Sequence, residues 1–529
     1  MLRGFSTLLL AIVLPCVGLI SVVSFADAGL VLREGHPGEP DSLDPHRAIS
    51  APALVVTNDL FEGLMTLDAR GRPVAGCAER YAVSADGKTY TFQLRSGLQW
   101  SDGSPLNAND FVYSLRRLAD PATATTALAS YIDLIAGGAA VLARKAPPDT
   151  LGVSAPDART VRISLTHPAP YFLTVVALPA FAPVPRQPIE RHGREWTRPE
   201  HFIGNGPFVL SQWRPGDYIK VTRNSHFHDA KNVHLDAVVY KAIADLNTGL
   251  RLFQDGELDT LTNFPPEKLD WLRANMPQEL HLSPSLGVTV YAFNFRLPKF
   301  RDLRVRRALS LAIDRELLTT RVIHSGDLPA DGIVPAALPG FESQLRPASS
   351  PMATRVAQAR ALLAQAGYGP AHPLTVEILH HTSEEHKKIA LAVAAMWQQI
   401  GVQTTLRNAE RQIVDVAFRN GEFDIARAAW FSSFADPIGL LDMLRRASPA
   451  NGGAYQNPKF DALLAQAETS LDDGARNRLL RDAQTELISD QATIPLYFIV
   501  SRRLIARRVG GWRDDNLTAL RGARWLTVH

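Results

Sequence analysis

Apolar residues along the chain follow two spacings, and the spacing changes from one segment to the next. Residues 89–95 carry an apolar side chain at every second position, which predicts a half-buried strand. Residues 302–318 carry them three and four apart behind the capping residue Asp302, which predicts one helix. Its inward positions are Val305, Leu309, Ala312, Ile313 and Leu317. Because such signals alternate without a fixed repeat, we expect an α/β fold and not a solenoid.

The same alternation continues through the last third of the chain. A capping box from Thr382 to Glu385 opens a predicted helix, which the glycine at position 401 ends. The apolar face of this helix consists of Ile389, Val393, Met396, Trp397 and Ile400. A strand at 402–407, a helix at 410–420 and a strand at 423–431 follow. We expect these elements to form an α/β domain whose strand ends are exposed along one edge.

The strand at 423–431 ends in an unusual run, WFSSFADP. Two large aromatic residues, Trp430 and Phe431, are followed by two serines, a third aromatic residue and an Asp–Pro turn. Ligand sites of α/β proteins often form where strands end. The run is therefore our first candidate for a binding site.

Three stretches are expected to connect the regular elements. Residues 136–160 are rich in Ala, Gly and Pro and are predicted to be a surface connection. Residues 179–200 are rich in proline and charge and are predicted to cross between domains. Residues 203–209, IGNGPFV, are weak as a phosphate loop because proline and strand-like residues follow the glycines. We predict a turn there that leads into a strand at 208–213.

The N-terminus has the composition of an export signal. Arg3 precedes an apolar stretch at residues 8–25, and Ala26-Asp27-Ala28 then places small residues before Gly29. This pattern predicts a secretory signal peptide over residues 1–28, cleaved near Ala28/Gly29. An uncleaved membrane anchor is the alternative, and Pro15 argues against a lipoprotein site at Cys16. Cys77 would then be the single thiol of the mature chain, which excludes an intrachain disulfide.

Composition and charge describe an ordinary folded protein. The chain has 529 residues, of which 46% are hydrophobic and 21% are charged, and its net charge is +3. This length predicts two or three domains. No run of Lys or Arg marks a nucleic-acid surface.

Motifs for catalysis or metal binding are missing from the sequence. Neither a G-x-S-x-G nucleophile motif nor an HExxH motif occurs, and the acidic residues are scattered singly. His380 and His381 are adjacent, so on a strand they point to opposite sides, and His386 falls on the following helix. We therefore expect no enzyme activity, no cofactor and no metal, although a secreted hydrolase stays open as an alternative.

Ten stretches in order resemble one protein family. They are EPDSLDPHRA (39–48), LFEGLMTLD (60–68), YTFQLRSGLQWSDGSPLNANDFVYSLRRL (90–118), GNGPFVLSQW (204–213), FQDGELD (253–259), FRDLRVRRALSLAIDRELL (300–318), ALLAQAGY (361–368), EEHKKIALAVAAMWQQIGV (384–402), GEFDIARAAW (421–430) and IPLY (494–497). Together they resemble the periplasmic oligopeptide- and dipeptide-binding proteins, the substrate-binding components of ABC importers. The resemblance covers essentially the whole mature chain.

The resemblance implies an α/β clam-shell of two lobes with an additional inserted α/β domain. The expected lobe I comprises residues 29–51, 187–289 and 500–529, the inserted domain 52–186, and lobe II 290–499. The resemblance further implies a monomer in the periplasm, which closes around an extended peptide and delivers it to a permease and ATPase pair of the inner membrane.

Five ligand residues carry over from the family. Glu39 matches an acidic position near the ligand, and His386 matches a histidine near the peptide's C-terminal side. Arg427 lies within an apolar strand, where an unpaired charge is costly, so it requires either an acidic partner or a ligand carboxylate. Trp430 and Phe431 match the aromatic end of that strand, which lines side-chain pockets.

Other positions depart from the family, and the most important departure is Ser433. Peptide-binding members carry there an Asp that pairs with the free α-ammonium of the peptide, and losing such a pair costs about 2–5 kcal/mol. Asp436 is the only acid nearby in the sequence. The remaining departures are Leu128 for a ligand-contacting Tyr, Arg411 for a pocket Trp, Phe418 beside Arg419 for an Arg that receives the peptide carboxylate, and Val290 with Phe431 for a pair of cysteines.

These departures remove an acid from the expected pocket and keep basic residues there. The expected ligand-binding set is Glu39, His386, Arg411, Arg419, Arg427, Trp430, Phe431, Ser433 and Asp436. The hypothesis is a peptide-class ligand that lacks a free α-amine or is rich in acid, such as an N-blocked peptide, a muropeptide or an opine-like compound. A metal chelate or a sugar-like ligand on the same fold, and a chaperone with an open cleft, stay open.

Overall fold

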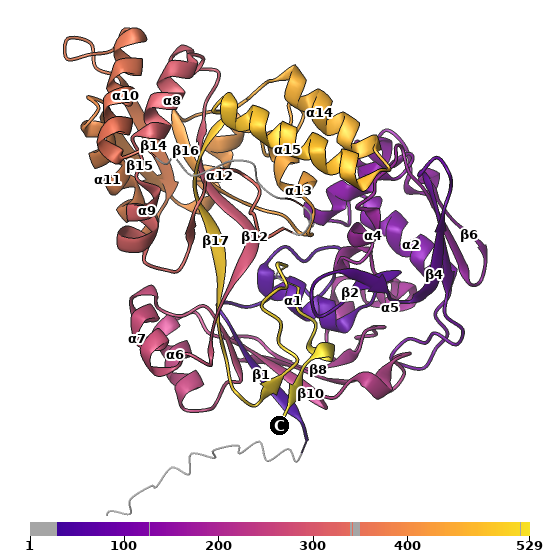
Figure 1. Cartoon of the computed structure of the whole chain (residues 1–529). Coiled ribbons are helices and arrows are strands. Elements are labelled where there is room, and N and C mark those ends of the chain that lie inside the picture. Colours follow the sequence, from indigo (N-terminus) through magenta and orange to yellow (C-terminus); the bar gives the residue numbers. More distant parts are fainter. Residues whose placement is uncertain (1–28, 126, 339–340, 342–349, 519) are drawn as a thin grey trace, which may run out of the picture.

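One large sheet runs through most of the molecule (Figure 1). The computed structural model describes residues 29–125, 127–338, 341, 350–518 and 520–529. The predicted signal peptide, including Cys16, lies outside the described residues. Ten strands of the sheet follow the order β15-β14-β16-β12-β17-β11-β1-β10-β9-β8, and β13 pairs with β17 beside them. Their bounds are β1 Val31–His36, β8 Phe208–Arg214, β9 Tyr218–Arg223, β10 Ala237–Ala242, β11 Thr260–Thr262, β12 Leu280–Phe293, β13 Leu328–Pro329, β14 Thr375–His381, β15 Gln403–Ala409, β16 Ile425–Phe431 and β17 Thr493–Ile505.

The strands β12 and β17 connect the two halves of this sheet. They are antiparallel partners along nearly their whole length, from the Leu280–Leu504 pair to the Ala292–Thr493 pair. At one end β17 pairs with β11, and at the other end β12 pairs with β16. The register shifts between Pro284 and Val288. In Figure 1 both strands pass between the lower part of the molecule, with β1, β8 and β10, and the upper left part, with β14 to β16.

Helices flank the β14–β16 end of the sheet, and their ends show two differences from the sequence prediction. The helix expected at 302–318 breaks, because Asp314 accepts the N–H of Leu317 and begins a new helical segment. As a result Leu317 is exposed and not inward. The helix expected from Thr382 is capped by Ser383 instead. The helices of this end are α8 Leu303–Leu311, α9 Arg315–Leu317, the π-helical Leu318–Ile323, α10 Met352–Gln365, α11 Glu384–Gln398 and α12 Arg411–Asn420.

A separate antiparallel sheet lies on the right in Figure 1, in the order β4-β5-β7-β6. Its strands are β4 Ala78–Val83, β5 Thr89–Leu94, β6 Val153–Asp157 and β7 Thr160–Ser164, accompanied by α2 Ala108–Ala119, α3 Gly138–Leu142, α4 Phe172–Val175 and α5 Arg186–His192. The strand expected at 89–95 is confirmed. The surface connection expected at 136–160 is wrong, because Val153 and Val141 are buried and β6 pairs with β7 there.

Further elements complete the lower and upper right parts. They are α1 Ala51–Leu60, α6 Leu246–Gln254, α7 Leu269–Asn275, α13 Ile438–Leu441, α14 Pro458–Thr469, α15 Asp473–Ser489, and the short pairs β2 Met65–Leu67 with β3 Pro73–Ala75 and β18 Val509–Gly510 with β19 Thr527–Val528. Of the helices in the described residues, none is both long and apolar enough to cross a membrane. The structure therefore has the two-lobed α/β architecture with an inserted α/β domain that the sequence predicted.

Candidate functional site

One edge of β16 carries no strand partner over most of its length. Along its other side, residues 425–431 pair with β12 without interruption. On the open side β14 pairs only with Ile425 and Ala426 and then ends at His381. Within the described residues, no strand pairs with residues 427–431 on that side, which we call the open edge. Such an edge presents unused N–H and C=O groups to any extended chain.

Basic and hydroxyl side chains gather where the open edge begins. The guanidinium of Arg427 donates to the Thr289 hydroxyl at 3.4 Å and lies beside the hydroxyl of Tyr497. Its Nε is buried without a hydrogen-bond partner, and no carboxylate of a described residue lies within 4 Å of its nitrogens. The acidic partner that would make Arg427 a purely structural residue is therefore missing from the described chain.

Two histidines lie close to this guanidinium. His381 ends β14, and its ring centre is 5.7 Å from that of His386 in the first turn of α11. The Nδ1 of His386 is buried and has no partner. Burial first, and then the charge of Arg427, lower the pKa of His386 to about 4. His386 is therefore neutral at pH 7 and can either donate or accept a hydrogen bond.

Phe431 and Trp430 are neighbours in sequence but lie on opposite faces of β16. Trp430 is 5% exposed and lines a small internal cavity with Phe418. Phe431 is 54% exposed, and its ring lies over Gly287, where a Cβ atom would come within 2.6 Å of it. The ring also reaches toward Ile499 of β17 across that glycine. Phe431 thus forms an apolar wall on the same face as Arg427.

The serines beyond the strand have different roles. Ser432 is part of the turn, since its N–H donates to the Leu286 carbonyl and its hydroxyl donates to the Phe434 carbonyl. Ser433 is half-buried at the far end of the open edge. No carboxylate of this turn is free to serve a ligand amine there, because Asp436 is held by an arginine.

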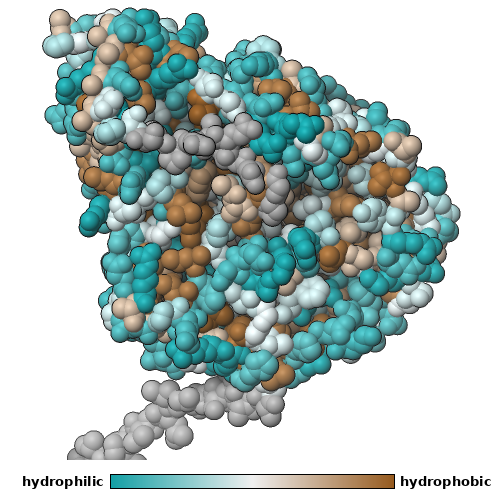
Figure 2. Space-filling model, viewed as in Figure 1, coloured by the Kyte–Doolittle hydropathy of each residue, from teal (hydrophilic) through white to brown (hydrophobic). Residues whose placement is uncertain are grey.

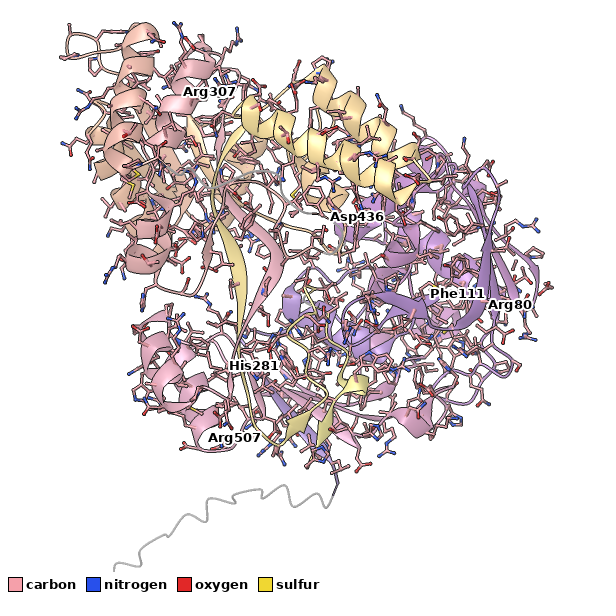
Figure 3. The ribbon with its side chains drawn as sticks, in the orientation of Figure 1. Arg80, Phe111, His281, Arg307, Asp436 and Arg507 are labelled. Atoms are coloured by element: carbon pink, nitrogen blue, oxygen red, sulfur yellow. The ribbon has the colours of Figure 1, made fainter. Side chains whose placement is uncertain are left out.

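Asp436 forms a two-point ion pair with Arg476 of α15. Both contacts measure 2.8 Å, and the Arg476 side chain is 6% exposed. The carboxylate also accepts the N–H of Ile438 and so begins α13. Figure 3 labels Asp436 next to the helix pair α14 and α15, where the upper lobe meets the inserted part. Asp436 therefore stabilises the turn.

The remaining predicted residues form no hydrogen bond or ion pair with Arg427 within the described chain. Glu39 is exposed after β1 and accepts the N–H of Gly216. Arg411 is 84% exposed and faces Asp415 of its own helix, and Arg419 is exposed at the end of that helix. The structure thus brings together Arg427, His386 and Phe431, with Ser433 at the end of the same edge. Arg411 lies beside this group, since its ion partner Asp415 is also 3.6 Å from His381. The described contacts of Glu39, Arg419, Trp430 and Asp436 are with other residues.

Sequence reasoning missed three members of this group. Tyr497, Thr289 and His381 contact or face Arg427. Tyr497 could have been found, because it stands in the IPLY stretch that carries the family resemblance. Thr289 and His381 carry no signal of their own, since only the pairing of β12 with β16 and the end of β14 bring them there.

The surface around the site is mixed in character. In Figure 2 hydrophilic residues cover most of the visible face, and apolar ones come to the surface in the recess below the upper left part. Within the described residues no three His, Cys, Asp or Glu side chains are grouped as metal ligands would be.

Comparison with known proteins relates the chain to bacterial solute-binding proteins. Residues 72–452 match the model of bacterial extracellular solute-binding proteins, family 5. The probable deoxycholate-binding periplasmic protein YgiS of Escherichia coli is 38% identical and covers 92% of this chain and 91% of its own. The periplasmic oligopeptide-binding protein OppA of Salmonella typhimurium is 36% identical, over 93% of this chain and 91% of its own. The structure of the Escherichia coli murein tripeptide-binding protein MppA superposes with a TM-score of 0.82 at 35% identity, over 95% and 99% of the two chains.

Proposed function

Because the chain belongs to family 5 of the bacterial extracellular solute-binding proteins, we propose that it captures a peptide-like acid for an ABC importer. The ligand carries a carboxylate at one end and no free ammonium at the other. The observation that carries this proposal is the open edge of β16, which begins at an unpaired arginine and ends at Ser433.

The open edge supports an extended ligand. A peptide laid along residues 427–431 would add a strand to the sheet, and its backbone groups would use the free N–H and C=O groups of β16. From 427 to 431 the strand rises by about 13 Å at roughly 3.3 Å per residue. This length corresponds to about three or four ligand residues.

Arg427 supports a carboxylate at the first end. Its Nε lacks a partner, and Tyr497 with His386 adds further hydrogen-bonding groups beside it. A guanidinium binds a carboxylate through two parallel hydrogen bonds, which are stronger than neutral ones. A bound carboxylate would also raise the lowered pKa of His386.

Ser433 supports the absence of an ammonium at the second end. A hydroxyl can accept a hydrogen bond from an amine but supplies no charge, and Arg476 holds the carboxylate of Asp436. An N-blocked peptide or an amine-free acid has no ammonium at this end, so it needs no carboxylate partner there. The relatives OppA and MppA are described as binding oligopeptides and murein peptides, so a muropeptide whose peptide N-terminus is blocked by its amide link to the sugar is a further member of this ligand class.

Phe431 favours a second candidate, an apolar carboxylic acid. The ring is more than half exposed and continues an apolar surface with Ile499, next to the guanidinium that would take the carboxylate. YgiS, at 38% identity, is named for deoxycholate, which combines a carboxylate with a rigid apolar skeleton. Deoxycholate therefore belongs in any ligand panel for this protein.

In the cell, the signal-like N-terminus and the periplasmic relatives support a periplasmic location. We propose that the protein is a monomer without catalytic activity and that its closed form docks on a permease and ATPase pair. The lobe boundaries at 51, 186, 289 and 499 belong to the same proposal, with hinge crossings at the last two.

Calorimetry with matched ligands tests the proposal. The panel is trialanine, N-acetyl-trialanine, a murein tripeptide and deoxycholate, each titrated into the wild type and Arg427→Met. We expect acetyl-trialanine or deoxycholate to bind more tightly than trialanine, and Arg427→Met to weaken both by about tenfold or more, since charged hydrogen bonds contribute about 1.5–3 kcal/mol.

Tight binding of free trialanine alone would overturn the amine-free ligand. In that case Asp514, which lies over Ser283 of β12, would be the acid to test by Asp514→Asn.

A further inference from the structure

The face of the sheet that carries the ligand site continues past it along β17. Tyr497, Ile499, Ser501 and Arg503 alternate on this strand, so their side chains share one face. Arg503 lies opposite His281 of β12 and donates to the Thr262 hydroxyl at 3.0 Å. Figure 3 labels His281 at the lower end of β12, beyond the narrow part of the molecule. The face therefore runs from Arg427 in one half of the sheet to Arg503 in the other.

Two guanidinium groups meet over a single indole at that end. Arg503 lies 5.4 Å from the ring centre of Trp512, and Arg521 lies 4.9 Å from the same ring. Arg521 is further fixed by two backbone carbonyls, those of Thr518 and Asn516. Both arginines thus have fixed positions before any ligand arrives.

Neither of these two arginines forms a direct ion pair within the described residues. Arg503 is 8% exposed, and neither it nor Arg521 has a carboxylate within 4 Å among the described side chains. The Nε atoms of both are buried without a partner. The nearest acids are committed elsewhere: Glu34 faces His36 at 3.1 Å, and Asp514 is bound by His281, Ser283 and Trp512.

Two neighbouring buried cations are unfavourable when the nearest carboxylates, Glu34 and Asp514, act on them only from beyond ion-pair distance. Burial, and then the charge of Arg503, lower the pKa of Arg521 to about 9. Both groups therefore stay protonated at pH 7 and repel each other across the indole. An anion placed between them would remove this repulsion and satisfy the free Nε donors.

We propose that Arg503, Trp512 and Arg521 form a second anion-binding site, which receives an acidic group at the far end of the ligand or a free oxyanion. The proposal rests on the proposed function only if the anion is the acidic group of the ligand, and not if it is a free oxyanion. It also places a second group of basic side chains along the cleft, on the opposite half of the sheet from Arg427.

The separation of the two sites defines the ligands that reach both. From the Tyr291–Arg427 pair to the His281–Arg503 pair, β12 advances ten residues. At about 3.3 Å per residue this is about 30 Å, and the two long arginine side chains shorten it to roughly 20 Å. An extended acid of about five or six residues therefore spans both sites.

The experiment compares succinyl-oligoalanines with acetyl-oligoalanines of the same length. Both series lack a free amine, and only the succinyl series has a carboxylate at the blocked end. Each is titrated by calorimetry into the wild type, Arg521→Gln and Arg503→Gln. The control is Arg513→Gln, which removes a cation of the same segment whose ion partner among the described residues is Asp515. A thermal-shift series with inorganic phosphate alone tests the free-anion source.

We expect the succinyl group to improve affinity by about 10- to 100-fold in the longer ligands, as charged hydrogen bonds do. Arg521→Gln should abolish this gain and Arg513→Gln should keep it. Since Arg503 is buried and its variant can fail to fold, Arg521→Gln decides the result. A phosphate stabilisation that Arg521→Gln removes would assign the site to a free oxyanion.

If neither series binds the wild type, the proposed ligand class fails, and the phosphate titration still tests the anion site. A succinyl gain that survives Arg521→Gln, or no effect of either anion, would overturn the second site.

Discussion

At the residue scale, Trp430 and Phe431 show how one step along a strand changes a side chain's role. Strand side chains alternate between faces, so the first packs in the core while the second covers Gly287 at the surface. Arg427 is four residues before Phe431, so the two side chains lie on the same face of β16. The consequence is that truncating Trp430 should affect stability, whereas changes at Phe431 and Arg427 should affect binding.

Ser433→Asp should change ligand preference. The new carboxylate would supply the missing charge at the end of the open edge, so trialanine should gain about 2–5 kcal/mol in binding free energy. Acetyl-trialanine should gain nothing and the succinyl ligands should lose affinity. Calorimetry measures these changes, with Ser433→Asn as a control of similar size and no charge. Equal gains for Asp and Asn would show that the effect is not electrostatic.

His386 should make the ligand-free protein less stable in mild acid. Its pKa is lowered from 6.5 to about 4 in the fold, so between these values the unfolded chain binds a proton that the folded chain does not. Stability therefore falls as pH decreases through this window. Thermal unfolding of the wild type and His386→Gln between pH 7 and pH 4 should show a shallower fall for the variant. A saturating carboxylate ligand should reduce the wild-type fall, and parallel curves for both proteins would contradict the prediction.

The sequence was sufficient for some of these residues. A charge in an apolar strand predicted that Arg427 requires either an acidic partner or a ligand carboxylate, and Ser433 followed from the family resemblance. The neutralisation of Asp436 could not be predicted, since Arg476 is far away in the sequence and meets it only through the packing of α15. The exposure of Arg411 and Arg419 also depended on which way α12 is rotated.

At the element scale, β14 and β16 create the site by their offset, because they pair only at Ile425 and Ala426. The pairing of β14 with β16 stops at Ala426, β14 itself ends at His381, and the chain then turns into α11. Residues 427–431 of β16 therefore have no strand partner on this side, and His386 is placed near their start. The strand and helix order of this region could be predicted from periodicity. The free edge could not, because strand pairing between distant segments leaves no periodic signal.

Backbone methylation of the ligand should test the free edge. An N-methyl group removes one N–H donor, so a methylated amide that faces β16 should lose about 0.5–1.5 kcal/mol of binding free energy, and more where the methyl group also clashes. Amides that point away should tolerate methylation. Calorimetry with a methyl scan of acetyl-trialanine should therefore give an alternating pattern, and a flat profile would contradict strand addition.

The cap of α11 can be tested in the same region. Ser383 accepts the His386 N–H, so Ser383→Ala should cost about 0.5–1 kcal/mol of stability. It should also weaken acidic ligands slightly, because the first turn carries His386. Chemical unfolding of Ser383→Ala and of its neighbour Thr382→Ala provides a matched comparison. A larger loss for Thr382→Ala would restore the cap that the sequence suggested.

At the scale of the whole molecule, an aromatic contact joins the inserted part to the second lobe. Phe434, next to the ligand turn, stacks on Tyr171 at 5.5 Å and meets Tyr131 edge-on at 5.4 Å. The guanidinium of Arg476, which pairs with Asp436, lies 5.6 Å from the ring centre of Tyr171. The turn that ends the binding edge is therefore tied to the part of the chain that faces it.

Phe434→Ala should weaken ligand binding without touching the ligand. Losing two aromatic contacts reduces the stabilisation free energy of the closed form by about 1–3 kcal/mol. The apparent affinity falls because the closed form is then less populated. Small-angle scattering should show a larger radius of gyration for the ligand-free variant, and calorimetry should show weaker binding of acetyl-trialanine. Phe434→Leu keeps an apolar side chain, so its affinity and its radius of gyration should lie between those of the wild type and Phe434→Ala. Unchanged scattering with unchanged affinity would show that the contact does not control closure.

The pairing of β11 with β17 has a consequence for biogenesis. The first strand of the described chain, β1, lies next to β11, and β11 is completed only by β17, late in the sequence. The first lobe therefore cannot finish folding while the chain is still being made or threaded through a membrane. Contacts between such distant segments form slowly. A protein whose early and late strands pair in this way cannot complete its fold until the last strands emerge. An export route that carries unfolded chains requires such an incomplete fold.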